Sequence, residues 1–329
     1  RAWDSRKPIE SSHNHNHLFT TKHTMSTIIS VASGKGGVGK SVVAANLALL
    51  LSRRGLRVTL ADLDIGGANL HVMFGVFTPP TSMTDFLTHQ VKTLQDAAYP
   101  LDATNRLFLL AGTGDTLATA NMPYARKKRL IRNLRELPSD IVVVDVGAGT
   151  GYHALDFFLM ADIHLAVATP DPTSVIDVYR FIKLAAIRHV LSAFLARDAM
   201  TDALSDRDFS SVQEVLDTAG QTDAAGQTIA ADALRHFRPC LVLNRMTSRS
   251  RINTLQLKKL LKDYIGGELT VLGEIPNDPA VEHSVRSYLP VVDTAPESPA
   301  SVALATIADA ILARIQLLER VTPQTAAPA

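Results

Sequence analysis

The sequence is poor in cysteine, in aromatic residues and in net charge. Its 329 residues include one cysteine, Cys240, and only 5% Phe, Trp and Tyr, and the formal net charge is +1. A single cysteine excludes a disulfide framework and a metal site built from the thiolates of this chain alone. The balanced charge gives no overall signature of a nucleic-acid-binding protein, so any basic surface must be local.

Long apolar runs are absent as well. No uninterrupted apolar stretch reaches roughly 18 residues, so the sequence predicts no membrane-spanning helix. The hydrophobic content is nevertheless 46%, and with so few aromatics it is typical of a buried parallel sheet covered by aliphatic helices. We therefore expect a cytoplasmic α/β protein, whose length allows one large domain or two smaller ones.

The first and last residues differ from the rest of the chain. Residues 1–24 are polar, without periodicity, and contain three histidines between positions 13 and 17; they predict a disordered tail rather than a metal site. Because Met25 directly precedes the first predicted strand, we expect the native chain to start there. The expected organisation is one domain over residues 25–320, with a helical insertion at about 196–236, and a disordered tail over 321–329.

Periodicity outlines the elements of this domain. Apolar, β-rich runs predict strands at 27–33, 57–61, 106–111, 141–145, 163–169, 240–244 and 269–275. Helical patterns occur at 42–51, 124–137, 175–195, 208–219, 227–236, 249–262 and 299–320.

The strongest motif is a phosphate-binding loop at residues 34–41, which matches G-x-x-x-x-G-K-[ST] in full. It reads Gly34, Lys35, Gly36, Gly37, Val38, Gly39, Lys40 and Ser41. A predicted strand precedes the loop and a helix follows it, which places the positive end of the helix dipole under bound phosphates. Lys40 would reach the β- and γ-phosphates and Ser41 would ligate Mg²⁺, while the glycine backbone turns around the anion. We expect the loop and Val42 to bind a nucleoside triphosphate.

Acidic residues at the ends of two predicted strands are candidates for the metal and for the attacking water. Asp62 and Asp64 follow the strand at 57–61, and Asp145 ends the apolar run 141–144. Loops at the carboxyl ends of parallel strands face the ligand crevice. Two carboxylates spaced i, i+2 can bind Mg²⁺ through water or orient a water, although turn or capping duty is an alternative. Asp145 fits the Walker B pattern and would hold Mg²⁺.

The loop also carries a second lysine, Lys35, and with it resembles the deviant Walker A motif of the MinD/ParA family. Residues 62–70 resemble the switch I of this family, and residues 145–149 resemble the switch II of its FlhG-like branch. Outside the insertion, the resemblance extends over nearly all of residues 25–320. It implies a doubly wound, mainly parallel sheet flanked by helices, with ATP-driven dimerisation and slow, partner-stimulated hydrolysis.

The resemblance implies a catalytic role for three of these residues. Lys35 would reach across an ATP-bound homodimer to the nucleotide of the partner subunit. Lys40 would hold the phosphates, and Asp64 would position the hydrolytic water. Asp62 would lie near the metal.

On the base side, the resemblance implies three further contacts. Asn244, at the end of a buried strand, matches the position that reads the adenine edge. Pro276 and Asn277 match the loop that covers the base. The cofactors expected are therefore ATP and Mg²⁺. The iron–sulfur carrier and nitrogenase-reductase branches require cysteines that this sequence lacks, so we expect no iron–sulfur cluster.

Two functions remain open at this point. One is spatial regulation of flagellar number or placement, or of cell-division or polar positioning, with a protein activator or cargo and peripheral association with the inner membrane or cell pole. The other is a ParA-like partition ATPase that binds nonspecific DNA through the basic 235–262 region. For that region a solvated face is the simpler interpretation, and for the helix at 299–320 docking on the core is simpler than membrane anchoring.

Overall fold

The computed structural model describes residues 25–64, 67–112, 122–194, 209–222, 225–250 and 268–321, together with residues 252, 257, 259 and 262. Its centre is an eight-stranded sheet in the order β3-β4-β2-β5-β1-β6-β7-β8. All neighbouring pairs are parallel except β3 with β4. The strands are β1 (Thr27–Ala32), β2 (Val58–Leu63), β3 (Tyr99–Pro100), β4 (Leu107–Leu110), β5 (Ile141–Val146), β6 (Ile163–Ala168), β7 (Cys240–Met246) and β8 (Thr270–Pro276).

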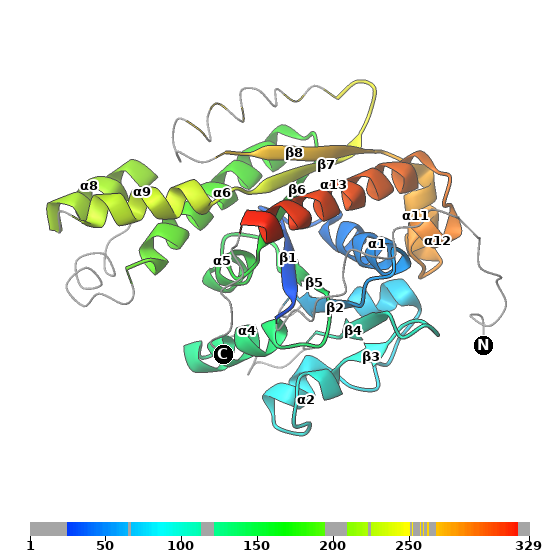
Figure 1. Cartoon of the computed structure of the whole chain (residues 1–329). Coiled ribbons are helices and arrows are strands. Elements are labelled where there is room, and N and C mark those ends of the chain that lie inside the picture. The colour runs from blue at the N-terminus through cyan, green and yellow to red at the C-terminus, as the bar shows by residue number, and fades with distance from the viewer. Residues whose placement is uncertain are drawn as a thin grey trace.

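Helices cover both faces of the sheet (Figure 1). The α-helices are α1 (Lys40–Arg53), α2 (Met83–Leu87), α4 (Tyr124–Arg135), α5 (Tyr152–Leu159), α6 (Pro172–Ser192), α8 (Val212–Thr222), α9 (Gly226–His236), α11 (Pro279–Arg286), α12 (Val291–Thr294) and α13 (Pro299–Val321). Two short 3₁₀ helices, η1 (Leu70–Phe74) and η2 (Gln95–Ala97), lie between β2 and β3.

The sheet separates two hydrophobic clusters because neighbouring strand residues point to opposite faces. In β1, Ile28 packs with the α4, α5 and α6 side, whereas Ile29 and Val31 pack with α1, α12 and α13. β5 is buried along its whole length, as its unbroken apolar run predicts for a parallel strand covered on both faces. The expected doubly wound, mainly parallel sheet is confirmed.

Helix α13 is long and apolar enough to be a candidate membrane span by length and composition alone. Leu304, Ile307 and Ile311 on its inner face are at most 1% exposed and belong to the core cluster that contains α1. A Cβ on Gly273 of β8 would lie 2.8 Å from Ile307 Cγ1, so the glycine lets helix and strand approach closely. The hydrophobicity of this face is therefore accounted for by docking on the sheet.

In the described part of the predicted insertion, helices α8 and α9 pack on one another and on α6, and Figure 1 shows the three helices extending to one side of the sheet. The helices expected at 208–219 and 227–236 are observed as α8, which begins and ends a few residues later, and α9. Val215 and Leu234 bury their side chains in the cluster on the α6 side of the sheet.

Some details of the fold differ from expectation. The strand expected at 106–111 is shorter, and β3 beside it was not predicted, because it has only two residues and one of them is Pro100, which is typical of a sheet edge. The helices α11 and α12, between the last strand and α13, were not predicted either. The helix expected at 249–262 lies mostly outside the described residues.

Candidate functional site

The phosphate-binding loop joins β1 to α1, as the motif predicts. Gly37 and Gly39 have φ of 79° and 90°, a backbone region in which residues with a Cβ are strained. A Cβ on Gly39 would also lie 2.3 Å from Asn244 Nδ2. That nitrogen donates a hydrogen bond of 2.8 Å to the carbonyl oxygen of Val38. The end of β7 therefore braces the loop from the side.

The first glycine of the loop packs against helix α6. A Cβ on Gly34 would lie 2.2 Å from the carbonyl oxygen of Asp177, which is far inside van der Waals contact. Because the obstacle is helix backbone, no side-chain rotation can relieve the overlap.

We expect Gly34→Ala to lower the free energy of unfolding by about 1–3 kcal/mol, because the loop and α6 must separate to admit the methyl group. Gly36→Ala is the matched control, since a Cβ there would have no described atom within 4 Å and its φ is not positive. Thermal and denaturant unfolding of the nucleotide-free protein measures the free energy of unfolding of both variants. Equal stability of the two variants would contradict the close packing.

Lys40 connects the loop with the acids of two neighbouring strands. Its Nζ lies 2.5 Å from Asp145 Oδ1 and 3.4 Å from Asp64 Oδ2. Asp145 lies at the end of β5 beside Asp62 in β2, with which it is in register. The sequence-predicted acids and the loop lysine thus come together at the carboxyl ends of adjacent parallel strands, where this class of sheet binds its ligands.

Asp62 and Asp64 differ in environment. The Asp62 carboxylate is buried and accepts hydrogen bonds from the backbone amides of Asp64, at 3.1 Å, and Leu70, at 3.0 Å. It therefore fixes the turn after β2. The side chain of Asp64 is 31% exposed, and a Cβ on Gly67 or Gly147 would lie 3.1 or 3.2 Å from its Oδ1. These glycines from both predicted switch segments leave room for Asp64.

The electrostatics of this cluster favour cations. Burial raises the pKa of Asp145 above its ordinary value, although the charge of Lys40 and hydrogen bonds from Lys40 and Ser41 offset part of this increase. The pKa of Asp62 is raised to about 7, chiefly by burial and then by the charge of Asp145. Asp145 and Asp64 contact the ammonium group of Lys40, and Asp62 lies on the neighbouring strand beside Asp145. Among the described residues no three His, Cys, Asp or Glu side chains form a ready-made metal site.

The side chain of Lys35 makes different contacts from that of Lys40. Its Nζ donates a hydrogen bond of 2.8 Å to Thr173 Oγ1, in the first turn of α6. The backbone carbonyl of Lys35 accepts a bond of 2.9 Å from Ser33 Oγ. The two lysines of the motif thus have different surroundings: Lys40 is buried among acids, and Lys35 rests on a hydroxyl at the surface.

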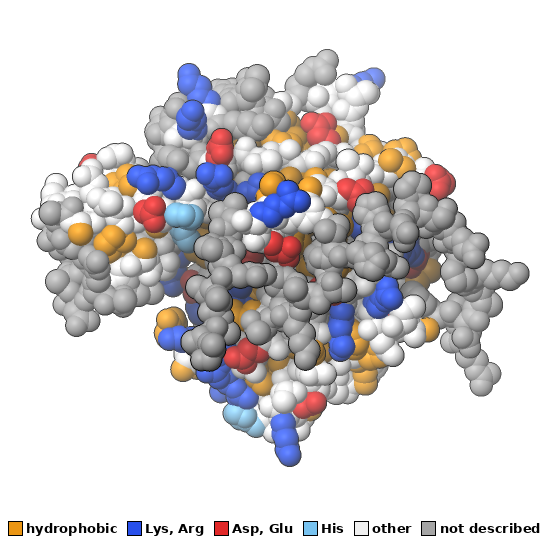
Figure 2. Space-filling view, viewed as in Figure 1, with side chains coloured by type: hydrophobic (Ala, Val, Ile, Leu, Met, Phe, Trp, Pro, Cys, Tyr) orange, Lys and Arg blue, Asp and Glu red, His pale blue; other side chains and the backbone are white. Residues whose placement is uncertain are grey.

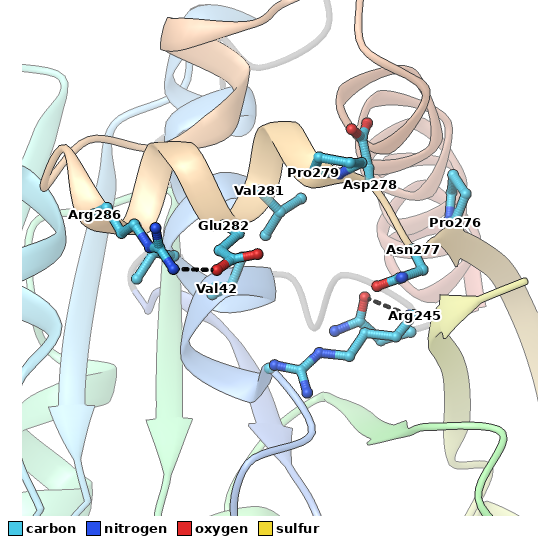
Figure 3. Close-up of a pocket in the computed structure, with 12 residues that line it drawn as sticks. Val42, Arg245, Pro276, Asn277, Asp278, Pro279, Val281, Glu282 and Arg286 are labelled. Atoms are coloured by element: carbon cyan, nitrogen blue, oxygen red, sulfur yellow. Dashed lines mark hydrogen bonds and ion pairs between the residues drawn. The ribbon is translucent and has the colours of Figure 1, made fainter.

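A pocket of about 530 Å³ adjoins the loop, and Figure 3 shows its walls. It includes five of the sequence-predicted residues: Gly39 from the loop, Val42, Asn244, Pro276 and Asn277. Asn244 is braced by its bond to Val38, and its Oδ1 also accepts a bond from the backbone amide of Arg245. The predicted base-side residues therefore line one cavity next to the phosphate-binding loop.

The opposite wall was missed by sequence reasoning. It comes from α11 and the residues before it, and its lining residues are Asp278, Pro279, Val281, Glu282, Val285 and Arg286. Arg245 of β7, across the pocket from α11, was also missed as a lining residue. A helix-start signal was available in the sequence, because Asp278 caps α11 by accepting a bond of 2.9 Å from the Ala280 amide and Pro279 follows it.

The predicted switch and basic segments are only partly described. Residues 65 and 66 of the predicted switch I lie outside the described residues, as do most of residues 251–267. In the described part of the basic region, Arg235 lies 3.7 Å from Asp232 and Arg245 lines the pocket. On the face seen in Figure 2, Lys and Arg side chains are interspersed with Asp and Glu side chains.

Comparison with known proteins shows that this chain is similar to a family model and to two named relatives. A model of the ParA family, described as "NUBPL iron-transfer P-loop NTPase", matches residues 24–192. The antiactivator FleN of Pseudomonas aeruginosa is 27% identical over 286 residues, which cover 86% of this chain and 85% of FleN. The iron–sulfur cluster carrier protein of Mycobacterium tuberculosis is 27% identical over 315 residues, covering 94% of this chain and 69% of the carrier.

Solved structures share the fold. The septum site-determining protein MinD of Pyrococcus horikoshii, determined as a complex with Mg-ADP, superposes with a TM-score of 0.62 at 24% identity. The likeness covers 89% of this chain and 99% of that protein.

Proposed function

Since the chain belongs to the ParA/MinD family of P-loop NTPases, we propose that it hydrolyses ATP with Mg²⁺ and that ATP binding drives its homodimerisation. The observation that carries the ATPase proposal is the contact of Lys40 with both Asp145 and Asp64 at the mouth of the phosphate-binding loop. A cation, two acids from separate strands and a loop of backbone amides are the parts that phosphoryl transfer requires.

In the nucleotide complex Lys40 exchanges its carboxylate partners for the β- and γ-phosphates. Ser41 and Asp145, which already interact through the Ser41 hydroxyl, would hold Mg²⁺, with Asp62 close by. A bound Mg²⁺ ion would neutralise charge on the phosphates. The freed Asp64 carboxylate then faces the γ-phosphate and orients a water for attack.

We expect Asp64→Asn to reduce the ATP hydrolysis rate by about 10²–10³-fold, because an amide cannot accept the water's proton. The ATP-bound dimer should accumulate, since its conversion to the ADP form is blocked. Asp96→Asn, at an exposed carboxylate in η2, is the control. A turnover assay and light scattering after gel filtration in ATP give the two readouts, and unchanged turnover would contradict the assignment.

For the biological role we propose spatial regulation, in which the ATP dimer binds a protein activator or cargo at a pole, division site or flagellar site. The support is the FleN relative, named an antiactivator, together with the branch-specific switch II residues at 145–149. We propose a cytoplasmic protein that associates peripherally with the membrane or pole. Pull-down with Asp64→Asn, with and without ATP, tests for the partner, and ATP-independent capture would count against a switch.

The ParA-like alternative makes a different prediction. Nonspecific DNA binding through the 235–262 region would appear as ATP-dependent, salt-sensitive retention on duplex DNA of unrelated sequence. No retention at low salt rejects this alternative and leaves spatial regulation.

The relationship to an iron–sulfur carrier raises a second candidate function, cluster transfer. Cys240 is fully buried in β7, and burial raises the pKa of its thiol, which disfavours the thiolate that a cluster requires. We therefore retain the expectation that no cluster is bound. The test measures the iron and sulfide bound after anaerobic reconstitution, in the wild type and in Cys240→Ala. Bound iron that is lost in the variant would overturn the expectation that no cluster is bound.

A further inference from the structure

An irregularity in β7 shapes the pocket wall opposite α11. Leu243 pairs with Glu274 of β8 and Met246 pairs with Pro276. Between these pairs β7 has two residues, Asn244 and Arg245, where β8 has one, so the strand contains a β-bulge. Bulges are local features that redirect side chains, and they are common beside functional sites.

The bulge brings two consecutive residues to the wall of the same cavity. In a regular strand neighbouring residues point to opposite faces, yet Asn244 and Arg245 both line the pocket. Arg245 has φ of 57°, which is unfavourable for a residue with a Cβ. Two hydrogen bonds stabilise this backbone conformation of Arg245. Its own amide donates to Asn244 Oδ1 at 2.9 Å, and the carbonyl of the next residue, Met246, accepts from the Asn277 amide at 2.7 Å.

The two arginines of the pocket differ in their partners. Arg286 is held by Glu282, one helical turn away on α11, at 2.5 Å. Among the ion pairs of the described residues none includes Arg245. In Figure 3 its side chain runs along the side of the pocket across from Val281 and Glu282, with the guanidinium extending toward α1.

The facing surface suits a flat, apolar group. Pro279, Val281 and Val285 line the pocket from α11, and Val42 of α1 and Pro276 of β8 add further aliphatic residues around it. A guanidinium is planar and stacks on aromatic faces, whereas an ammonium group is a compact point charge. A ring system lying against the aliphatic wall would present its other face to Arg245.

We propose that Arg245 is a base-binding residue: its guanidinium stacks on the nucleotide base and closes the pocket against the aliphatic wall of α11. This inference rests on the proposed nucleotide-binding function and extends it to a residue of this chain's own bulge. Under this proposal, Lys40 and the loop bind the phosphates of the nucleotide, and Arg245 binds its base.

The test compares a ligand that has a base with one that does not. Binding of ADP and of inorganic tripolyphosphate, each with Mg²⁺, is measured by calorimetry for the wild type and for Arg245→Gly. Glycine adopts the positive φ without strain, so the variant keeps the bulge. Arg132→Ala is the control for a general loss of charge, because this exposed arginine of α4 does not line the pocket and its loss should leave the affinity for both ligands unchanged.

For Arg245→Gly we expect ADP affinity to fall about five- to tenfold, while tripolyphosphate affinity changes less than twofold. Arg245→Lys should recover only part of the loss, because it restores charge without a planar group. An equal loss for both ligands would mean that Arg245 contacts phosphate, and unchanged ADP affinity would mean that it contacts nothing; either result overturns the proposal. Failure of the wild type to bind ADP would instead refute the nucleotide-binding function itself.

Discussion

Lys40→Ala is expected to weaken ATP and ADP binding by about 10²–10³-fold, equivalent to about 3–4 kcal/mol. Two effects add in the same direction. The phosphates lose a charged hydrogen-bond donor, which alone is worth about 1.5–3 kcal/mol. In addition, Asp145 and Asp64 lose the ammonium group that lies 2.5 and 3.4 Å away, so their charge opposes the incoming phosphates.

Calorimetric titration with ADP measures this loss, and Lys92→Ala, at an exposed lysine, is the control for a general change in charge. Unfolding of the nucleotide-free variant must be followed in parallel, because Asp145 is 1% exposed and an unpaired buried carboxylate destabilises the fold. Lys40→Met keeps the aliphatic stem and serves as a second variant. Retention of ADP affinity within tenfold in a folded variant would show that Lys40 does not hold the phosphates.

Lys35→Ala is expected to abolish the ATP-dependent dimer while ADP affinity changes less than fivefold. Within one subunit the Lys35 amine contacts Thr173, away from the cluster around Lys40, so its loss leaves the phosphate contacts of the same subunit intact. In a dimer whose lysines cross to the partner's phosphates, each interface loses two charge-assisted contacts, at about 2–5 kcal/mol each when desolvated.

Light scattering with ATP and with ADP distinguishes the monomer from the dimer. Thr173→Ala is the matched variant: it removes the only partner that the structure gives the Lys35 amine among the described residues, and so frees the lysine. We expect this variant to dimerise with ATP at least as well as the wild type. An ATP-dependent dimer of Lys35→Ala in the same assay would rule out the crossing role.

Much of the site was predictable because its motifs are local. The loop from Gly34 to Ser41 lies between a β-rich run and a helical run, and that order determines where its amides and its lysine face. Asp62 and Asp145 end buried strands, and parallel strands of one sheet present their carboxyl ends at one edge. The structure places both acids in register there. The binding and catalytic roles of these residues stay predictions.

Contacts between distant segments account for most of what was missed. Gly34 is packed by Asp177, and the phosphate-binding loop is braced by Asn244, some two hundred residues along the chain. Periodicity says nothing about such pairs, because it reports only which face of an element is buried. The β3 edge and α11 are also too short for a periodic pattern to stand out.

By itself, the sequence determined that this chain forms a mainly parallel α/β sheet with a phosphate-binding loop at its first strand, and that it carries the deviant lysine at position 35. Only the tertiary structure decided which groups the two lysines contact without nucleotide. Lys40 contacts a buried acid, and Lys35 contacts a hydroxyl at the surface. It also decided that Arg245 lines the pocket. The physical reason is that strand register and a bulge set the direction of a side chain, and both depend on which strands pair.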